Sequence, residues 1–554
     1  MKLSKEITVD GKSVSVPVTL LDRVVNYFSP EKGGGRYRER VRLAMSGAYT
    51  GADKRRRANQ LGSRRELSAD SAILPDLPTL REESQHLCRN NAIAAGAIKT
   101  NITKVVGTGL YVKSQVDRDL LGMSDEQADQ WERDAEREFR LATETKEIDS
   151  ERQLSFSLFQ GLVFLKALED GDVFVNMPRF KRAGSPYTLK LQMIEAARVC
   201  NKDFVADSAE MAGGISKDKY GAPEKYHVLN VHPGNSSFAF LARNKKQYKW
   251  SSLKSFGSDG DPLVLHLFDK VRPGQSRGVP YLSTVVELIK QLGRYTDAEV
   301  MAAVVTGMLT VFVTNETGSP NFGPAPTAEN PDADPSLQVD TTGMELGYGS
   351  VVGLMPGEKI ESVNPGRPNT AFDGFVLAVL RQIGVALELP FEILVKHFTS
   401  SYSASRAAFE EAWDYFSRRR HWLVLSLCQP VYEAVISEAV AAGRLGAPGF
   451  FADPLIKKAW LGTLWTGDAP SQLDPKKEID SAVARINARL SSRAEERARL
   501  IGGDWEAALP QIIREEKLLE ENNLLPKETG AEMTVEPPVE PPAEPAANTE
   551  EEEK

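Results

Sequence analysis

Cysteine is scarce in this sequence. Its 554 residues include three cysteines, Cys88, Cys200 and Cys428, which lie far apart and form no CxxC pair. An odd, sparse set of this kind is typical of free thiols in a reducing compartment rather than of a disulfide framework. The spacing also argues against a structural metal site built on thiolates.

Long hydrophobic runs are absent as well. The longest apolar stretch, residues 301–313, is shorter than the roughly 20 residues that a membrane-spanning helix needs. The first residues, MKLSKEITVDGKSVSVPV, lack the apolar centre of a secretory signal peptide. The sequence therefore predicts neither a membrane span nor export.

Several motifs of enzymes are missing too. There is no GxxxxGK[ST] loop, which argues against an ATP-driven motor, and neither a GxSxG elbow nor an HExxH pair occurs. His227 and His232 are five residues apart in a predicted strand, so they face opposite sides and make a poor metal pair. We therefore expect a protein that is not an enzyme and that has no cofactor and no metal.

One pair of carboxylates leaves an alternative open. Asp170 and Asp172 flank Gly171 between a predicted helix and a predicted strand. Two carboxylates can hold a metal ion for nuclease chemistry. Asp and Gly are also common turn residues, because they tolerate unusual backbone angles. The turn is the favoured interpretation, and a metal-dependent DNA-processing nuclease remains the alternative.

The negative charge is concentrated at the C-terminus. The net charge is −9, and residues 527–554 hold nine acids and two lysines, which leaves −2 for the rest. A body so close to neutral is unlike a tight nonspecific DNA binder, which is usually basic. The tail itself, with its EPPVEPPAEP run, is too polar and proline-rich to pack, so we expect it to be disordered.

Residues 31–65 are locally basic, with eleven Lys and Arg against three acids. The favoured interpretation is a solvated, flexible arm. The alternative is an arm that touches DNA or an acidic neighbour.

Hydrophobic spacing predicts an α+β fold with several long helices. Phe372, Phe375, Val376, Val379, Leu380, Ile383 and Leu387 follow one helical face, and Pro390 should end that helix. Ser and Thr residues at 399–405 offer N-caps for a next helix, which Pro430 should kink. Other predicted helices are 81–106, 122–141, 281–313 and 476–525. Predicted strands are 109–114, 171–177, 187–194, 225–231 and 263–268, with a further short strand in 348–364.

Four segments in order support a family resemblance. They are 68–110, 168–175 (LEDGDVFV), 271–289 (VRPGQSRGVPYLSTVVELI) and 365–413, and their spacing fits across roughly 40–520. The chain resembles the lambda-type portal proteins of tailed phages. The resemblance implies a ring, expected to be a dodecamer, at one capsid vertex of the virion, through which double-stranded DNA is packaged and ejected. It implies docking of the terminase large subunit and then of neck or head-completion proteins, contact with major capsid or scaffolding protein, no membrane, and assembly in the host cytoplasm. A different head–tail adaptor or minor capsid protein remains a second alternative.

The resemblance also divides the chain. It implies a basic N-terminal arm (1–65), an α+β wing (66–280), a first stem helix (281–309), a clip (310–366), a second stem helix (367–388), a channel loop (389–403), a long kinked helix that returns to the wing (404–475), a helical crown (476–526) and a disordered acidic tail (527–554).

The channel loop is the predicted DNA contact. By resemblance it projects into the channel, where Lys396, and His397 when protonated, would contact phosphate. The loop residues predicted to face DNA are Val395, Lys396, His397, Phe398, Thr399, Ser400, Ser401 and Tyr402. The alternative is a capped interhelical loop buried at a subunit contact.

Three consecutive arginines follow in the next helix. Arg418, Arg419 and Arg420 cover most of a helix circumference, so they cannot all face one partner. Contacts between subunits are favoured over contact with DNA.

Overall fold

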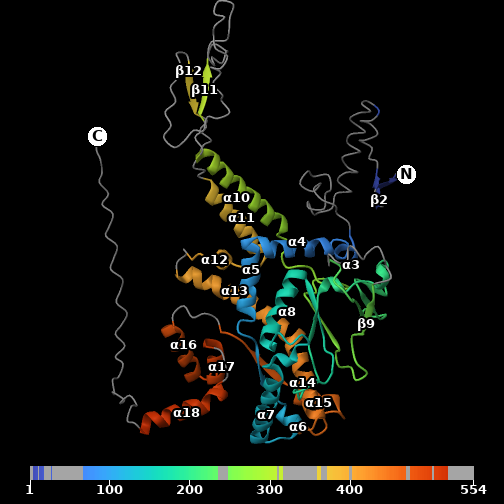
Figure 1. The fold of residues 1–554 in the computed structure, drawn as a ribbon, viewed down its shortest axis with the longest axis vertical. Helices are drawn as coiled ribbons and strands as arrows, with labels where there is room; N and C mark the ends of the chain where they lie inside the picture. The colour runs from blue at the N-terminus through green and yellow to red at the C-terminus, as the bar shows by residue number, and fades with distance from the viewer. Residues whose placement is uncertain are drawn as a thin grey trace, which may run out of the picture. The chain divides into compact units, whose positions relative to one another are not determined.

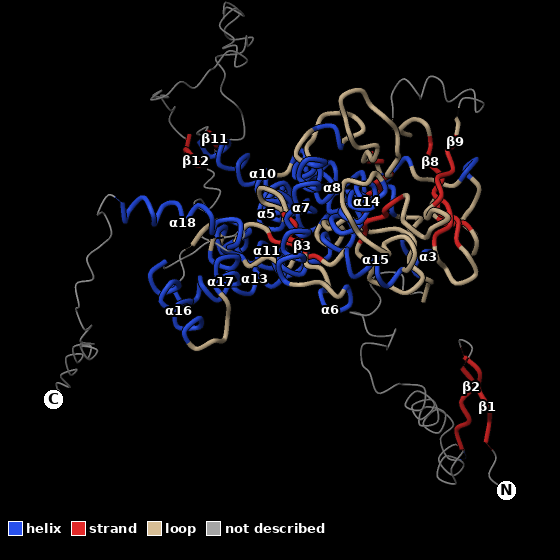
Figure 2. The backbone as a smooth tube through the Cα atoms, turned by 90° about the horizontal axis from the view of Figure 1, so that it is seen from below, coloured by secondary structure: helices blue, strands red, loops and turns tan. Residues whose placement is uncertain are grey.

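The computed structural model of this chain describes residues 4–9, 12–17, 27, 66–234, 248–307, 311–315, 358–362, 371–398, 402–469, 475–501 and 505–521. The predicted basic segment 31–65 and the acidic tail 527–554 lie outside these residues. The chain divides into two compact units, Met1–Ser71 and Ala72–Lys554. Figures 1 and 2 show the elements of both.

The first unit contains a β-hairpin. β1 (Ser4–Val9) pairs antiparallel with β2 (Lys12–Pro17), with Val9 opposite Lys12. α3 (Ala69–Ile73) crosses the boundary between the units. The hairpin lies within a segment for which the sequence analysis predicted only an arm.

The second unit mixes helices and strands, as the sequence predicts. Helices make up much of it, and β8 and β9 lie together in Figure 2. The helices are α4 (Leu77–Asn90), α5 (Ala92–Val105), α6 (Arg118–Leu121), α7 (Asp125–Thr143), α8 (Phe156–Asp170), α10 (Val286–Gly307), α11 (Phe372–Ala386), α12 (Phe391–Val395), α13 (Tyr402–Leu423), α14 (Gln429–Ala441), α15 (Pro454–Trp460), α16 (Pro475–Asn487), α17 (Arg493–Leu500) and α18 (Trp505–Glu521). The strands are β3 (Tyr111–Ser114), β4 (Asp172–Asn176), β5 (Gln192–Ile194), β6 (Met211–Ala212), β7 (Ile215–Lys217), β8 (Pro223–Leu229), β9 (Trp250–Lys254), β10 (Val264–Phe268), β11 (Val311–Asn315), β12 (Glu358–Ser362) and β13 (Thr463–Thr466).

The strands form small antiparallel sheets. A three-stranded sheet has the order β10-β4-β5, and a four-stranded sheet has the order β6-β7-β8-β9. β11 pairs with β12, and β3 pairs with β13 although Ser114 and Thr463 are far apart in sequence. β4 and β5, which lie within the predicted strands 171–177 and 187–194, pair with each other.

The predicted helix 81–106 is two helices. α4 ends at Asn90, and the Asn91 side chain accepts hydrogen bonds from the backbone N–H groups of Ile93 and Ala94. This N-cap satisfies donors that a continuous helix would have bonded to the preceding turn, so α5 starts afresh.

The main core joins distant parts of the second unit. Phe159 and Val163 of α8 are buried with Phe139 of α7 and with Val431 and Tyr432 of α14. A smaller core lies between the two sheets and includes Phe174 and Val228. Each helix contributes one apolar face, so residues from 87 to 461 share one interior.

The long helix around Pro430 changes its hydrogen-bonding pattern where a kink was predicted. Residues Val424–Cys428 are π-helical, and α14 starts at Gln429 with Pro430 in its first turn. Proline has no backbone N–H to bond the preceding turn, and a π-bulge accommodates that loss. By length and composition, Ala404–Ala441 is the one helix among the described residues that is apolar enough to cross a membrane, but half of its apolar window is buried inside the protein.

Candidate functional site

A tight turn joins α11 to α12. Glu388 has a left-handed backbone with φ of 53°, and the N–H of Leu389 donates to the carbonyl of Gly384 at 2.9 Å. A Cβ at Gly384 would lie 2.6 Å from the Leu389 oxygen, so the approach needs a glycine. The connection between the two helices therefore takes four residues, and Pro390 is the N-cap residue of α12.

α12 forms a buried base beneath the exposed segment that begins at Lys396. Ile393 and Leu394 each expose 5% of their surface and belong to the main core. Lys396 ends α12 in a left-handed conformation with φ of 57°, and its N–H and that of His397 both donate to the Glu392 carbonyl. The backbone thus leaves the core at Lys396.

Beyond α12 the described side chains face solvent. Lys396 and His397 are exposed, Val395 is half-buried, and the half-exposed Phe398 stacks on Phe409 with ring centres 5.4 Å apart. Thr399, Ser400 and Ser401 lie outside the described residues, as does the side chain of Tyr402, where α13 begins.

The predicted channel loop 389–403 is only partly a loop. Its first half contains α12, because Ile393 and Leu394 have a core to pack against. Ser403 and Ser405 lie inside the first turn of α13, so they are not the N-caps that the sequence suggested. The exposed part starts at Lys396, and its contact with DNA stays a prediction.

The three arginines of α13 each have a partner within this chain. Arg418 pairs with Glu388 at 2.6 Å and Arg419 with Asp269 at 2.7 Å. Arg420 donates to three backbone carbonyls, those of Lys104, Val105 and Asp468. The three point in different directions, as predicted, and they join α13 to three other segments. A further contact with DNA or a neighbouring subunit stays a prediction.

Asp172 is the centre of a buried ionic cluster that sequence reasoning missed. Its side chain is fully buried and accepts from Arg81 at 2.7 Å, from Arg277 at 2.5 Å and from His266 at 3.2 Å. Arg277 also donates to the carbonyls of Ala196, Val199 and Gly213. Burial opposes ionisation of Asp172, but the guanidinium groups of Arg277 and Arg81 outweigh it and hold its pKa well below the usual range.

This arrangement disfavours the nuclease alternative. Both oxygens of Asp172 already accept from cations, and Asp170 accepts from Gln85 at 2.7 Å. Burial raises the pKa of Asp170, which suits a metal ligand poorly. Gly171 is left-handed, as the turn interpretation requires, with φ of 89°. Among the residues that the structure describes, no group of three or more His, Cys, Asp or Glu side chains could hold a metal ion.

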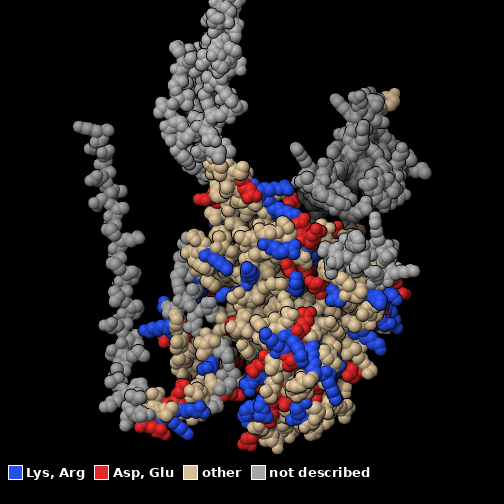
Figure 3. All heavy atoms as spheres, in the orientation of Figure 1, with Lys and Arg blue, Asp and Glu red and all other residues tan. Residues whose placement is uncertain are grey.

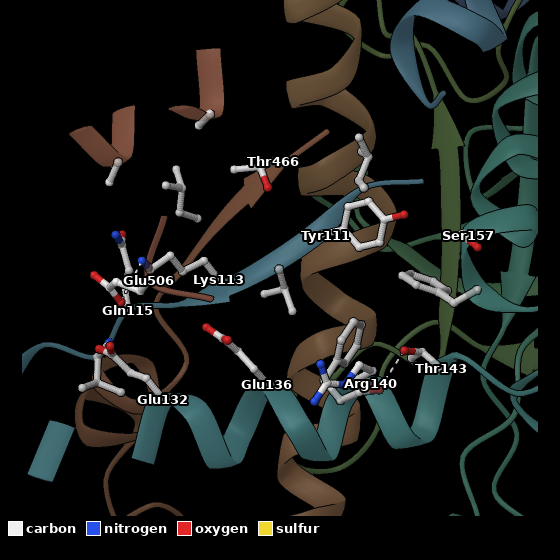
Figure 4. Close-up of a pocket in the computed structure, with 18 of the residues that line it drawn as sticks. Tyr111, Lys113, Gln115, Glu132, Glu136, Arg140, Thr143, Ser157, Thr466 and Glu506 are labelled. Atoms are coloured by element: carbon white, nitrogen blue, oxygen red, sulfur yellow. Dashed lines mark hydrogen bonds and ion pairs between the residues drawn. The ribbon is translucent and has the colours of Figure 1, made fainter. Parts of the chain in front are cut away.

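A cavity of about 1050 Å³ lies between α7, the β3–β13 pair and the C-terminal helices α17 and α18. Figure 4 shows Glu132 and Glu136 projecting from α7 toward β3. Both carboxylates accept backbone N–H groups, from Val116 and Ser114 respectively, at 2.9 Å. These two hydrogen bonds tie α7 to the end of β3 and to the segment that follows it.

α10, which precedes β11 in the chain, and α11, which follows β12, both expose apolar side chains. α10 and α11 lie side by side, with Tyr295 packed against Phe372 and Phe375 (Figure 1). The sequence predicted that Phe375 is buried, but it is half-exposed. The apolar face that it shares with Leu380 and Ile383 becomes buried only toward the C-terminal end of α11. Exposed apolar side chains on the two helices are Val300, Met301, Val304, Phe375 and Val385.

Comparison with known sequences assigns the family. The profile described as "Phage portal protein, lambda family" matches residues 54–420, well over half of the chain. The chain is 24% identical to the portal protein of Escherichia phage N15 over 468 residues, which cover 81% of this chain and 86% of the relative. It is 24% identical to portal protein B of Escherichia phage lambda over 464 residues, covering 81% and 85%. The chain belongs to the lambda family of phage portal proteins, as the sequence motifs predicted.

Solved structures give a weaker likeness. A chain in the virion of a native gene transfer agent particle matches with a TM-score of 0.41 and 12% identity, over 76% of this chain and 92% of that one. A chain in the neck of the native particle, computed with C12 symmetry, matches with a TM-score of 0.40. The family assignment rests on sequence alone.

Proposed function

We propose that this portal protein works as a closed ring at one capsid vertex of the virion and passes double-stranded DNA through its centre. The observation that carries the proposal is the exposed Lys396–His397 tip on a buried base, within a chain that matches the portal family over residues 54–420. A ring of identical subunits needs a head-to-tail interface that closes on itself. The exposed apolar side chains of α10 and α11 would be covered in such an interface.

The described elements suit the parts that the family implies. We assign α10 and α11 to the stem, the β11–β12 pair to the clip, and α16, α17 and α18 to the crown. The α+β part from α4 to β10 is the proposed wing. The basic arm before residue 66 and the tail after residue 526 complete the division.

The proposed channel works through weak contacts repeated around the ring. Lys396 and His397 from each subunit meet phosphates, and each contact is easily exchanged as DNA slides. The near-neutral charge of residues 1–526 suits this role, because strong phosphate binding would slow DNA. A dodecamer would multiply the tip twelvefold.

The proposed partners follow from the same role. The clip docks the terminase large subunit during packaging and neck or head-completion proteins afterwards, and the wing contacts major capsid or scaffolding protein. Assembly takes place in the host cytoplasm. The protein has no catalytic step of its own in this scheme.

The test is the symmetry of the purified chain. Class averages from electron microscopy, together with native mass, should show a closed ring whose central hole admits duplex DNA. Val385→Asp, which places a charge at a side chain that is 83% exposed in the single subunit, should prevent ring closure without lowering the melting temperature of the subunit. A stable monomer or dimer of the unmodified chain at every salt and protein concentration would refute the ring.

A further inference from the structure

One face of β9 carries aromatic and basic side chains in line. Alternate residues of a strand share a face, so Tyr248, Trp250, Ser252 and Lys254 follow one another along this face. Trp250 and Leu253 are half-buried, while Ser252 and Lys254 are exposed. The opposite face packs on the small core through Leu253. The face with Lys254 is exposed at its lysine end, whereas Leu229, opposite Trp250 in the register, and His227, opposite Ser252, are buried.

The neighbouring strand adds a second lysine at the same level. Lys225 of β8 lies directly opposite Lys254 in the antiparallel register. Both are exposed, and no acidic side chain among the described residues pairs with either. Like charges in directly opposed positions destabilise a sheet, so the pair costs stability in the isolated subunit.

A histidine bridges the middle of this face. His227 Nε2 lies 2.8 Å from Ser216 Oγ, and Nδ1 lies 3.0 Å from Ser252 Oγ. Burial together with Lys202 and Lys225 lowers the pKa of His227, so the imidazole is neutral at pH 7. The positive charge of the face therefore comes from lysines.

Three rings form the other end of the face. Phe204 lies edge-on to Tyr248 and Trp250, with ring centres 5.3 and 5.1 Å away. Phe204 is 56% exposed, although it is held in place by two consecutive left-handed residues, Asp203 and Phe204. Strain of this kind is kept where a side chain must be presented in one position. Figure 3 shows Lys and Arg side chains gathered over this part of the molecule, at the right of the view.

We propose that this surface, made of Phe204, Tyr248, Trp250, Lys225 and Lys254, binds the acidic proline-rich tail of the portal protein, from its own or a second copy of the chain. We call it the tail-binding face. Its occupant is the run EPPVEPPAEP at 536–545, in which Glu536, Glu540 and Glu544 alternate with pairs or single prolines.

Trp250 and Lys254 are four residues apart, and a strand rises about 3.4 Å per residue, which places the rings and the lysine pair about 14 Å apart. A segment that contacts both needs a glutamate a few residues away from a proline, and the run at 536–545 has prolines on both sides of Glu540. Prolines stack on the three rings while a glutamate reaches the lysine pair, as in other aromatic grooves that bind proline-rich segments.

The 33 residues after Glu521 tether the run at 536–545 to the rest of the chain. A tethered segment has an effective concentration near the millimolar range, so a weak contact suffices to fill the face. When the tail occupies the tail-binding face, another anionic partner can bind there only by displacing the tail.

A peptide titration tests the proposal. A fluorescein-labelled peptide of residues 535–546 is titrated, by fluorescence anisotropy, with the full chain and with a chain that stops after Pro526 and so keeps every described residue. The shortened chain should bind the peptide at least about tenfold more tightly than the full chain, whose own tail competes. The affinity should fall as salt rises, because opposite charges meet.

Three variants locate the contact on the shortened chain. Lys225→Glu with Lys254→Glu, and separately Phe204→Ala with Tyr248→Ala, should each weaken peptide binding about tenfold or more. The matched control is Lys146→Glu with Lys458→Glu, which reverses two exposed lysines elsewhere and should leave binding unchanged. A peptide with Glu536, Glu540 and Glu544 all changed to Gln tests the charges on unaltered protein, and it too should bind about tenfold more weakly.

Several results would overturn the proposal. The first is that the peptide shows no saturable binding to the shortened chain. The second is that the lysine-reversed and control variants bind the peptide equally, and the third is that the Glu and Gln peptides bind equally. A duplex DNA oligomer that binds the tail-binding face where the peptide does not would assign the face to nucleic acid instead. None of these measurements needs a ring, so they stand apart from the test of ring formation.

Discussion

The hydroxyl of Tyr281 donates a hydrogen bond to the backbone carbonyl of Leu387. Tyr281 lies just before α10, and Leu387 is the first residue after α11, so this bond joins the two proposed stem helices where they meet the core. The amide of Asn101 reaches the same hydroxyl at 3.5 Å. Burial raises the pKa of Tyr281 well above its ordinary value, so the hydroxyl keeps its proton and remains a donor.

Tyr281→Phe should therefore destabilise the second unit. It removes the donor to Leu387 and leaves a carbonyl without that partner, at a cost of about 1–3 kcal/mol in the free energy of unfolding. Urea unfolding measures the change. Tyr220→Phe is the control, because Tyr220 is 83% exposed, and it should change stability by less than about 0.5 kcal/mol. Equal effects of the two changes would contradict the role of the bond.

Two glycines of α11 make a matched pair. Gly384→Ala places a Cβ 2.6 Å from the Leu389 oxygen, whereas Gly374→Ala meets no atom within 4 Å. We expect Gly384→Ala to destabilise the protein by about 1–3 kcal/mol through overpacking. Gly374→Ala should stabilise it by up to about 1 kcal/mol, because alanine is the better helix former. Melting temperatures measure both, and a shift in the same direction would refute the tight turn.

Asp172→Asn should be severely destabilising. The change leaves Arg81 and Arg277 buried without a counter-charge, and breaking one partner of a buried ion pair costs about 3–5 kcal/mol. Asp119→Asn, at an exposed carboxylate, is the control. Denaturant midpoints compare the two, and a loss below about 1 kcal/mol at Asp172 would show that the cluster contributes little.

Acid should weaken the protein through His266. Burial lowers the pKa of His266 below its ordinary value, even though Asp172 favours the charged form. As the pH falls, the unfolded chain therefore takes up a proton at this histidine before the folded protein does. The contribution of neutral His266 to the free energy of unfolding is present above about pH 6.5 and is lost as the pH falls below that value. Between pH 7.5 and 5.5 the wild type should therefore lose more of its free energy of unfolding than His266→Gln does.

The control for this pH effect is His421→Gln. His421 is exposed, and the slope of stability against pH in this variant is the reference for His266→Gln. Asp172 contributes in the same direction but at lower pH, because its depressed pKa keeps it ionised until well below about pH 3.9. Equal slopes for the wild type and His266→Gln would contradict the assignment to His266.

Reversing the charge of the proposed channel tip should affect DNA rather than assembly. Lys396→Glu with His397→Glu changes two exposed residues, so rings should form as in the wild type. Packaged DNA in a complementation assay should fall roughly tenfold, because carboxylates repel phosphate. Lys458→Glu, an exposed lysine of α15, is the control. Normal packaging by the double variant would exclude the tip from the DNA path.

Local pattern was enough to predict much of the fold. The apolar spacing around Trp131 and Phe139 predicted α7, which buries one face, and this face fixes the helical period. The short apolar run Val173–Val175 after a Gly turn predicted β4, which is buried on both faces. The split at Asn91 also had a local signal, since asparagine is a strong N-cap, as did the hairpin in which Asp10 and Gly11 stand between β1 and β2.

The rest depended on contacts between distant residues. Asp172 looked like a turn residue because nothing near it in sequence announces Arg81 or Arg277. Likewise, α12 was hidden in a predicted loop because Ile393 and Leu394 form a helix against a core assembled from other segments. The resemblance to a family predicted a loop that contacts DNA, and this contact stays a prediction. It did not predict which part of that loop is buried.

The pairing of β13 with β3 has a consequence for synthesis of the chain. Tyr111 leaves the ribosome about 350 residues before its partner Thr466, and contacts so distant in sequence form late and slowly. Until then the edge of β3 is unpaired, and unpaired edges invite association with other chains. A nascent chain is therefore open to premature association through this edge until translation has passed residue 466, so synthesis of β13 sets the earliest moment at which β3 can be protected.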